Sequence, residues 1–270
     1  MPEFPCPEPV LLVTRVGGGA VDVVSEDRQT ATVEVAPYDD SDASREAATN
    51  TRVEMRQGRL LVEAPDASGW LFRRNPRIRV DIRLPLDCPV QLKVASADVS
   101  CHGRYATAAI NSASGDVFVE AVTGDVTANT ASGDVRIGDV GGRLDVKAAS
   151  GDVSVQQATG PVTVHSASGD VEVDEAGEGV RATTASGDVR IGAARKGTLS
   201  LRSASGDISV GVVAGTGVWL DLVTMSGSTR SDLAVGGTQE PRSGAPELTV
   251  QVRTASGDIE IRRVVEPATA

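Results

Sequence analysis

An aspartate returns at a near-constant interval in this sequence, and its carboxylate is the group best suited to chemistry. It stands in Ala-Ser-Gly-Asp-Val at residues 113–117, and four further copies follow at intervals of eighteen residues. If these copies stack, like charges about 5 Å apart repel one another, so each carboxylate needs a compensating partner. The aspartates of the series are Asp98, Asp116, Asp134, Asp152, Asp170, Asp188 and Asp207.

Two kinds of partner fit such a column, bound Ca²⁺ or hydrogen-bond donors. Calcium-binding β-rolls also use nine-residue units with Gly and Asp, but they place the apolar residue two positions after Asp. Here the apolar residue follows Asp directly, and Gly-Gly occurs only once within the repeats. We therefore predict that each Asp accepts hydrogen bonds from corner N–H groups and Ser hydroxyls while it faces water, with no metal or other cofactor. The calcium ladder, kept as the alternative, would comprise Asp116, Asp134, Asp152, Asp170, Asp188 and Asp207.

Other reactive side chains form no catalytic set in this pattern. The Ser of Ser-Gly-Asp recurs in every copy, whereas a nucleophile is singular and needs a base. The two histidines are His102, which follows a cysteine, and His165, which occupies an outward repeat position; both are assigned structural or neutral roles. The Gly-Gly-Gly run at residues 17–19 lacks the Lys-Ser/Thr of a phosphate-binding loop. The sequence predicts no enzyme.

The elements that position the aspartates are short strands in a nine-residue unit, two units making one coil. Positions seven and nine are apolar and position eight is mostly polar, which is the period-two pattern of a half-buried strand. Position three is Ala or Val throughout and is predicted to line a narrow interior near the corner. The pattern predicts an all-β fold, a parallel β-solenoid with right-handed winding, because parallel crossovers are overwhelmingly right-handed.

Ser-Gly-Asp at positions four to six has the composition of a turn. Gly tolerates positive φ, and Asp hydrogen-bonds nearby backbone. We therefore predict a structural corner at each repeat glycine, namely Gly115, Gly133, Gly151, Gly169, Gly187, Gly206 and Gly257.

Composition narrows the function and the compartment. The net charge is −11, which disfavours nucleic acid and anionic membranes as partners. No signal segment and no run of eighteen apolar residues is visible, so a cytoplasmic location without a membrane span is expected. The three cysteines, Cys6, Cys88 and Cys101, suggest buried or free thiols, with a bridge between Cys88 and Cys101 as the alternative.

The repeats divide the chain into regions. The seven candidate strands of the N-terminal region are residues 10–16, 20–24, 30–36, 52–56, 59–63, 77–84 and 90–94, with the Gly run at 17–19 between the first two. The polar stretch at residues 40–50 is predicted to be a surface loop, and Trp70-Leu71-Phe72 to cover a core edge. The predicted regions are a tail at 1–9, irregular β-rich coils and a cap at 10–94, regular repeats at 95–215, atypical coils at 216–264 with an inserted loop at 236–246, and a tail at 265–270.

The residues Asp22–Val24, the Ile82-Arg83-Leu84-Pro85 segment and the run of Ala-Ser-Gly-Asp-Val/Ile repeats resemble the bacterial β-strand-repeat family labelled "putative adhesin", a domain of unknown function. The resemblance covers about residues 10–262. It implies a β-solenoid fold and surface adhesion, and it brings no catalytic residues.

These observations together predict a non-catalytic, adhesin-like scaffold that presents a flat sheet surface to a protein partner or to itself. One alternative is a filament-forming solenoid of the bactofilin kind, because an open terminal coil offers unpaired backbone groups to another chain. The other is a calcium- or glycan-binding module that uses the Asp-lined corner. A homo-oligomer through sheet faces or solenoid ends fits either structural reading.

Overall fold

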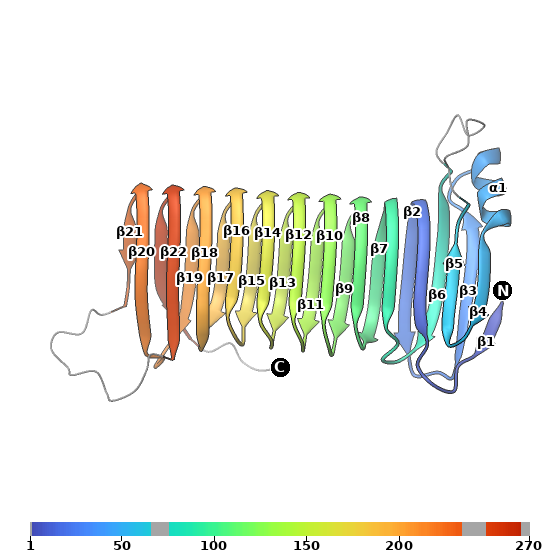
Figure 1. The fold of residues 1–270 in the computed structure, drawn as a ribbon, viewed down its shortest axis with the longest axis horizontal. Helices are drawn as coiled ribbons and strands as arrows, with labels where there is room; N and C mark the ends of the chain where they lie inside the picture. Colours follow the sequence, from blue (N-terminus) through green and yellow to red (C-terminus); the bar gives the residue numbers. More distant parts are fainter. Residues whose placement is uncertain (1, 66–75, 234–246, 266–270) are drawn as a thin grey trace. The chain divides into compact units, whose positions relative to one another are not determined.

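A computed structural model describes residues 2–65, 76–233 and 247–265. The chain divides into two compact units, Met1–Gly141 and Gly142–Ala270, which are described separately. Both are built almost entirely of strands that stack in parallel coils (Figure 1). The predicted all-β, parallel β-solenoid fold is confirmed.

Each coil of the second unit contributes one strand to each of two sheets. In one sheet β12 pairs with β14 and β14 with β16; in the other β13 pairs with β15 and β15 with β17. Paired residues are eighteen apart in sequence, as in Leu144, Val162 and Val180. The strands are β12 (Leu144–Ser150), β13 (Val153–Ala158), β14 (Val162–Ser168), β15 (Val171–Ala176), β16 (Val180–Ser186) and β17 (Val189–Ala194).

The coils that follow stack in an order different from their order in the sequence. β18 (Gly197–Ser205) and β19 (Ile208–Val213) pair with the last strands of the chain, β22 (Leu248–Ser256) and β23 (Ile259–Val264). These in turn pair with β20 (Val218–Ser226) and β21 (Thr229–Ser231). The last coil in sequence is therefore inserted between two earlier ones. The predicted loop at residues 236–246 lies outside the described residues.

The first unit contains the same coil and an irregular beginning. β8 pairs with β10, and β9 with β11, at the eighteen-residue spacing, and the long strand β7 pairs with both β8 and β9. β2 pairs in parallel with β7 on one side and with β5 and β6 on the other. The strands are β2 (Leu11–Glu26), β5 (Arg59–Glu63), β6 (Ile78–Pro85), β7 (Val90–Tyr105), β8 (Ala108–Ser114), β9 (Val117–Val122), β10 (Val126–Ser132) and β11 (Val135–Val140).

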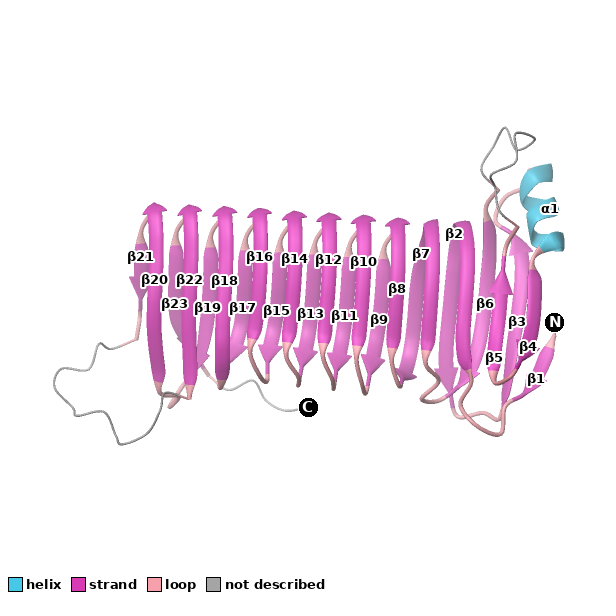
Figure 2. Cartoon of the chain, viewed as in Figure 1, coloured by secondary structure: helices cyan, strands magenta, loops and turns pink. Residues whose placement is uncertain are grey.

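Antiparallel strands end this unit. β3 (Thr30–Pro37) pairs with β6, β1 (Glu3–Pro5) with β3, and β4 (Arg52–Arg56) with β5. Helix α1 (Asp42–Asn50) packs on β3 and β6 (Figure 2). The Trp70-Leu71-Phe72 cluster, predicted to cover a core edge, lies outside the described residues.

The loop predicted at residues 40–50 is wrong, because the structure forms helix α1 there. The Ser41 side chain caps the first turn by accepting a hydrogen bond from the Ser44 N–H at 3.2 Å. Ser44 and Ala47 are buried under the helix. Packing of that face on β3 and β6 stabilises a short helix whose polar composition gives little sign of it.

The separation of residues 10–16 and 20–24 into two strands is also wrong, because β2 runs through the Gly run without a break. Gly19 has a φ of +116°, and a Cβ there would lie 1.9 Å from the Ile78 carbonyl oxygen. Gly19 therefore bends a continuous strand rather than ending it.

The small residue at repeat position three does not always face the interior. It is buried in alternate units, as in Val122 and Ala158, but in the Ala-Ser-Gly-Asp units it is exposed, as in Ala113 and Ala167. In these units the preceding residue points inward, because side chains alternate along the strand up to the corner. The prediction is thus wrong for half of the units.

The core of each coil is a stack of aliphatic side chains. Val155 and Val173 are fully buried, and Val162 and Val164 face them from the other sheet of the coil. A Val155→Ala variant should lower the free energy of unfolding by about 1.5–3 kcal/mol, through lost burial and a residual cavity. Chemical denaturation measures this loss. Ser154→Ala, which changes a neighbouring outward side chain, is the control, and equal losses for both variants would contradict the inward assignment.

Candidate functional site

The Ser-Gly-Asp corner closes on the corner of the adjacent coil. Its glycines have φ values between +115° and +148°. A Cβ at Gly187 would lie 2.2 Å from the Gly169 carbonyl oxygen, and one at Gly206 would lie 2.2 Å from that of Gly187. Glycine is therefore required twice over at these corners, by backbone conformation and by the approach of the neighbouring coil.

The aspartate side chains form a chain of hydrogen bonds from coil to coil. In the second unit the Asp188 N–H donates to Asp170 Oδ1 at 2.8 Å, and the Asp207 N–H donates to Asp188 Oδ1 at the same distance. Asp170 and Asp258 donate in the same way, to Asp152 and Asp207 respectively. The first unit repeats the pattern at 3.1 Å (Asp116 to Asp98) and 3.0 Å (Asp134 to Asp116).

Each aspartate backbone carbonyl is used as well. Asp188 O accepts the Val171 N–H at 2.9 Å, and Asp207 O accepts the Val189 N–H at 2.9 Å. At the end of the series the Ser228 N–H donates to Asp258 Oδ1, and this bond lowers the pKa of Asp258. These are the corner N–H hydrogen bonds that the non-metal interpretation requires. Among the described residues no group of three or more His, Cys, Asp or Glu side chains is arranged to hold a metal ion.

The two histidines lie outside any acid–base set in the described structure. His165 is exposed on β14. His102 Nδ1 lies 3.7 Å from Glu120 Oε2, and its ring is 5.3 Å from that of Phe118. Glu120 Oε2 also accepts the Gly103 N–H at 2.7 Å, so this carboxylate supports a local turn.

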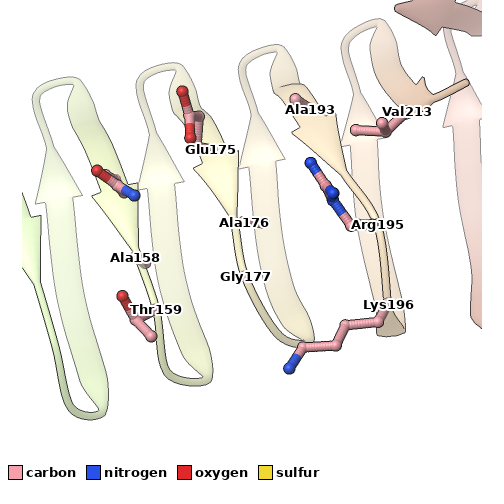
Figure 3. Close-up of a pocket in the computed structure, with 10 residues that line it drawn as sticks. Ala158, Thr159, Glu175, Ala176, Gly177, Ala193, Arg195, Lys196 and Val213 are labelled. Atoms are coloured by element: carbon pink, nitrogen blue, oxygen red, sulfur yellow. The ribbon is translucent and has the colours of Figure 1, made fainter. Parts of the chain in front are cut away.

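A groove of about 300 Å³ with a mixed lining lies on the second unit, along the ends of β13, β15 and β17. Its floor is made by small residues such as Ala158 and Ala176, and its sides carry Glu175, Arg195 and Lys196. Figure 3 shows Arg195 and Lys196 on one segment, with Thr159 and Glu175 on neighbouring coils. The lining therefore carries side chains of both charges beside small apolar residues.

Residues 19–262 match the model of the Toastrack family, DUF4097. The chain belongs to this family. The predicted resemblance to the bacterial "putative adhesin" repeat proteins is thereby confirmed. No curated protein matches the chain in sequence.

A solved structure shares the fold of this Toastrack chain. A putative adhesin from Bacteroides fragilis has a TM-score of 0.50 and 13% identity, over 97% of this chain and 95% of that one. A putative lipid binding protein from Parabacteroides distasonis has a TM-score of 0.47 and 16% identity, again over 97% and 95%. At 13% identity, the likeness to the Bacteroides fragilis protein concerns the fold alone. Within the described residues, no helix is long and apolar enough to cross a bilayer.

Sequence reasoning missed a second set of corner residues in this Toastrack chain. Before six of the seven Ser-Gly-Asp serines, the residue two positions earlier is a buried Ser or Thr whose hydroxyl donates to a corner carbonyl, whereas Ala148 stands at this position before Ser150. Thr130 donates to the Ser132 carbonyl at 3.0 Å and Thr184 to that of Ser186 at 3.1 Å. The signal was present in the sequence as a hydroxyl residue before the repeat Ala. The residues are Ser112, Thr130, Ser166, Thr184, Ser203 and Thr254.

The three cysteines are free and buried, so the Cys88–Cys101 bridge is not formed. Burial raises the pKa of the Cys101 thiol to about 12, with a smaller contribution from the Asp22 carboxylate. Tyr105 is buried beside it, and its hydroxyl donates to the carbonyls of Val23 and His102. These groups fill the core of the first unit.

The corner bond predicts a specific pair of mutational effects. Asp188→Ala removes the acceptor of the Asp207 N–H and should lower the free energy of unfolding by about 1 kcal/mol. Asp188→Asn keeps a side-chain oxygen at this position and should stay within about 0.5 kcal/mol of the wild type. Chemical denaturation of the three proteins measures the difference. An Asn variant as unstable as the Ala variant would show that the charge, and not the acceptor, is required.

The buried thiol predicts a loss of stability at high pH. Below the ordinary thiol pKa of 9.0, Cys101 is protonated in both states and contributes no pH dependence. Between that value and about 12, the unfolded chain releases the proton and the folded chain keeps it, so the free energy of unfolding falls by about 1.4 kcal/mol per pH unit. The pKa of Tyr105 is also raised by burial and adds to the wild-type slope.

A comparison with Cys101→Ala isolates the thiol. The variant should show a shallower decline than the wild type when unfolding is followed by circular dichroism over this pH range. Parallel curves for the two proteins would contradict the assignment.

Proposed function

We propose that this Toastrack chain is a non-catalytic interaction scaffold that presents one flat sheet of the second unit to an acidic protein surface. The part of this sheet that carries the proposed face comprises β12, β14, β16, β18 and β22, and β20 pairs with β22 beyond it. Its repeated corner residues are engaged in holding the coils together, which leaves the outward side chains between the corners to determine binding.

One observation carries this proposal, a stripe of basic side chains along the outer face of that sheet. Strand register places Lys147 beside His165, His165 beside Thr183, Thr183 beside Arg202, and Arg202 beside Arg253. Arg181 lies in the adjacent column, next to Thr163. We call Lys147, His165, Arg181, Arg202 and Arg253 the basic stripe; all five are exposed.

The basic stripe stands out because the chain is acidic overall, with a net charge of −11. Adjacent strands are about 4.8 Å apart, so the four steps from Lys147 to Arg253 cover roughly 19 Å. That length suits a protein contact rather than a small anion. Arg253 has an ion pair with Asp221 at 3.7 Å, whereas no described carboxylate lies within 4.0 Å of the charged groups of Lys147 or Arg202.

The outer face of the opposite sheet differs in charge. Arg190 there lies 3.5 Å from Glu172, and the neighbouring outward residues include Ser154 and Ser209. Charges that are neutralised within the face attract a partner less strongly than cations without an ion pair, such as Lys147 and Arg202. The sheet with the basic stripe is therefore the binding face in this proposal.

A photo-crosslinking amino acid at Thr183, in the middle of the basic stripe, tests the proposal in an extract of the source cells. One discrete product should form, and the Lys147→Glu/Arg202→Glu double variant should reduce its yield roughly tenfold because both charges are reversed. The same amino acid at Ser209, half-buried on the opposite sheet like Thr183, is the matched control.

Three results would contradict the proposal. These are the absence of a product from Thr183, the same product at equal yield from Ser209, and a yield that the double charge reversal leaves unchanged. Each variant should first show wild-type thermal unfolding, so that a change in yield reports binding and not folding.

A further inference from the structure

The coil formed by β20 and β21 has an open edge in the described structure. β20 pairs with β22 on one side, and no described strand pairs with its other side. Its inward residues Val218, Leu220 and Leu222 are only half-buried, whereas their partners Leu248, Val250 and Val252 are fully buried. An incomplete core and an unpaired strand edge therefore lie together.

Three of the outward side chains of this strand are also apolar, and the fourth is Asp221. Trp219 is 48% exposed, Val223 46% and Met225 85%. These are three of the five large hydrophobic side chains that are strongly exposed among the described residues. An exposed apolar edge of nine residues is a site for strand addition.

The antiparallel end of the first unit is protected in a way that β20 is not. Its edge strand β4 reads Arg-Val-Glu-Met-Arg, with ion pairs from Arg52 and Arg56 to Glu54. The edge strand β1 has three residues and ends at Pro5. Short, charged and proline-containing edges resist pairing, so head-to-tail stacking of copies, as the filament alternative requires, lacks a receptive surface there.

We propose that a second copy of this chain pairs with the open edge of β20, giving a two-fold symmetric dimer in which the two β20 strands are antiparallel and centred on Leu222. A two-fold axis places the same surface of both copies in contact and makes adjacent strands antiparallel.

The backbone geometry permits this register. The Leu248 N–H donates to the Gly217 carbonyl at 3.1 Å. Because alternate residues of a strand direct their N–H and C=O groups to opposite sides, residues 218, 220, 222 and 224 direct theirs away from β22. Centring on Leu222 pairs Leu222 with its copy and Leu220 with Thr224. The N–H and C=O groups that are directed away from β22 then all find antiparallel partners.

The side chains fit the same register. In an antiparallel ladder the non-hydrogen-bonded residue pairs have the closest side chains. In this register those pairs are Trp219 with Met225 and Asp221 with Val223. A thioether beside an aromatic ring is a favourable contact. Centring on Asp221 instead would oppose that carboxylate to its own copy, which destabilises a pair. The Leu222 register also pairs all nine residues of the strand.

Charge at position 223 tests both the dimer and its register. Val223→Asp places a carboxylate opposite Asp221 of the second copy, twice per dimer, and should raise the dissociation constant about tenfold or more. Val223→Lys creates two opposite-charge pairs and should leave the dimer at least as tight as the wild type. Within one chain the effects are reversed, because position 223 is beside Arg253 in the β20–β22 register. If the substitutions acted only through the stability of the single chain, Val223→Lys would therefore weaken the dimer more than Val223→Asp.

Sedimentation equilibrium and light scattering over a wide range of protein concentrations measure the association of the wild type and both variants. A wild-type dimer weakened by Val223→Asp and retained by Val223→Lys is the expected result. A wild type that is monomeric at every concentration would overturn the proposal, whether the edge is then covered by the chain itself or by a strand of another protein. A dimer that neither substitution alters, or that both weaken equally, would equally overturn it. Because the test substitutes no residue of the basic stripe and measures self-association of the purified chain, its failure is distinct from failure of the proposed function.

Discussion

The hydrogen bond between the backbone N–H of one corner aspartate and the carboxylate of the next is the interaction on which the coil stack depends. At the corner, glycine at positive φ turns the chain, so the following N–H cannot continue the regular ladder of strand bonds. Asp188 Oδ1 lies 2.8 Å from the Asp207 nitrogen and supplies the missing acceptor. The side-chain oxygen thus gives each corner N–H an acceptor on the neighbouring coil and links successive coils throughout the stack.

This interaction also limits how the corner residues can act on other molecules. A column of carboxylates looks like a cation site. In each unit, however, one oxygen of such a carboxylate already accepts a backbone N–H from the neighbouring coil, as in Asp116 and Asp170. The residues that repeat most strictly are therefore those that hold the coils in register. Functional differences must lie where the repeat is loose, at outward positions such as those of Lys147 and Arg202. Substitution there changes the surface charge and leaves the aliphatic core intact.

The repeat predicts the coil, its two strands and its glycine corners, because one nine-residue pattern of apolar and turn residues specifies all three. It does not predict which side of the strand each residue faces near the corner, since the alternation of Ala113 and Ser112 depends on where the strand ends. The basic stripe was missed for a related reason: Lys147 and Arg202 are far apart in sequence and become neighbours of the same column only through coil stacking. Helix α1 depends on packing against β3 and β6, which its polar sequence does not reveal.

The order of the last coils shows another limit of the repeat pattern. Every coil presents a similar edge, so periodicity alone cannot distinguish a coil added at the end from one inserted between two others. The inserted coil has Ile259 and Ile261 at core positions, whereas the terminal coil has Thr229 and Ser231 at the matching positions. Polar residues are tolerated in this coil because no further coil of the described structure covers them, and they remove apolar surface from half of the open edge. β20 keeps leucines at its core positions instead. The two strands of this coil thus differ at their core positions, which are polar in β21 and apolar in β20. Only β20 leaves apolar surface whose burial would favour the addition of another strand.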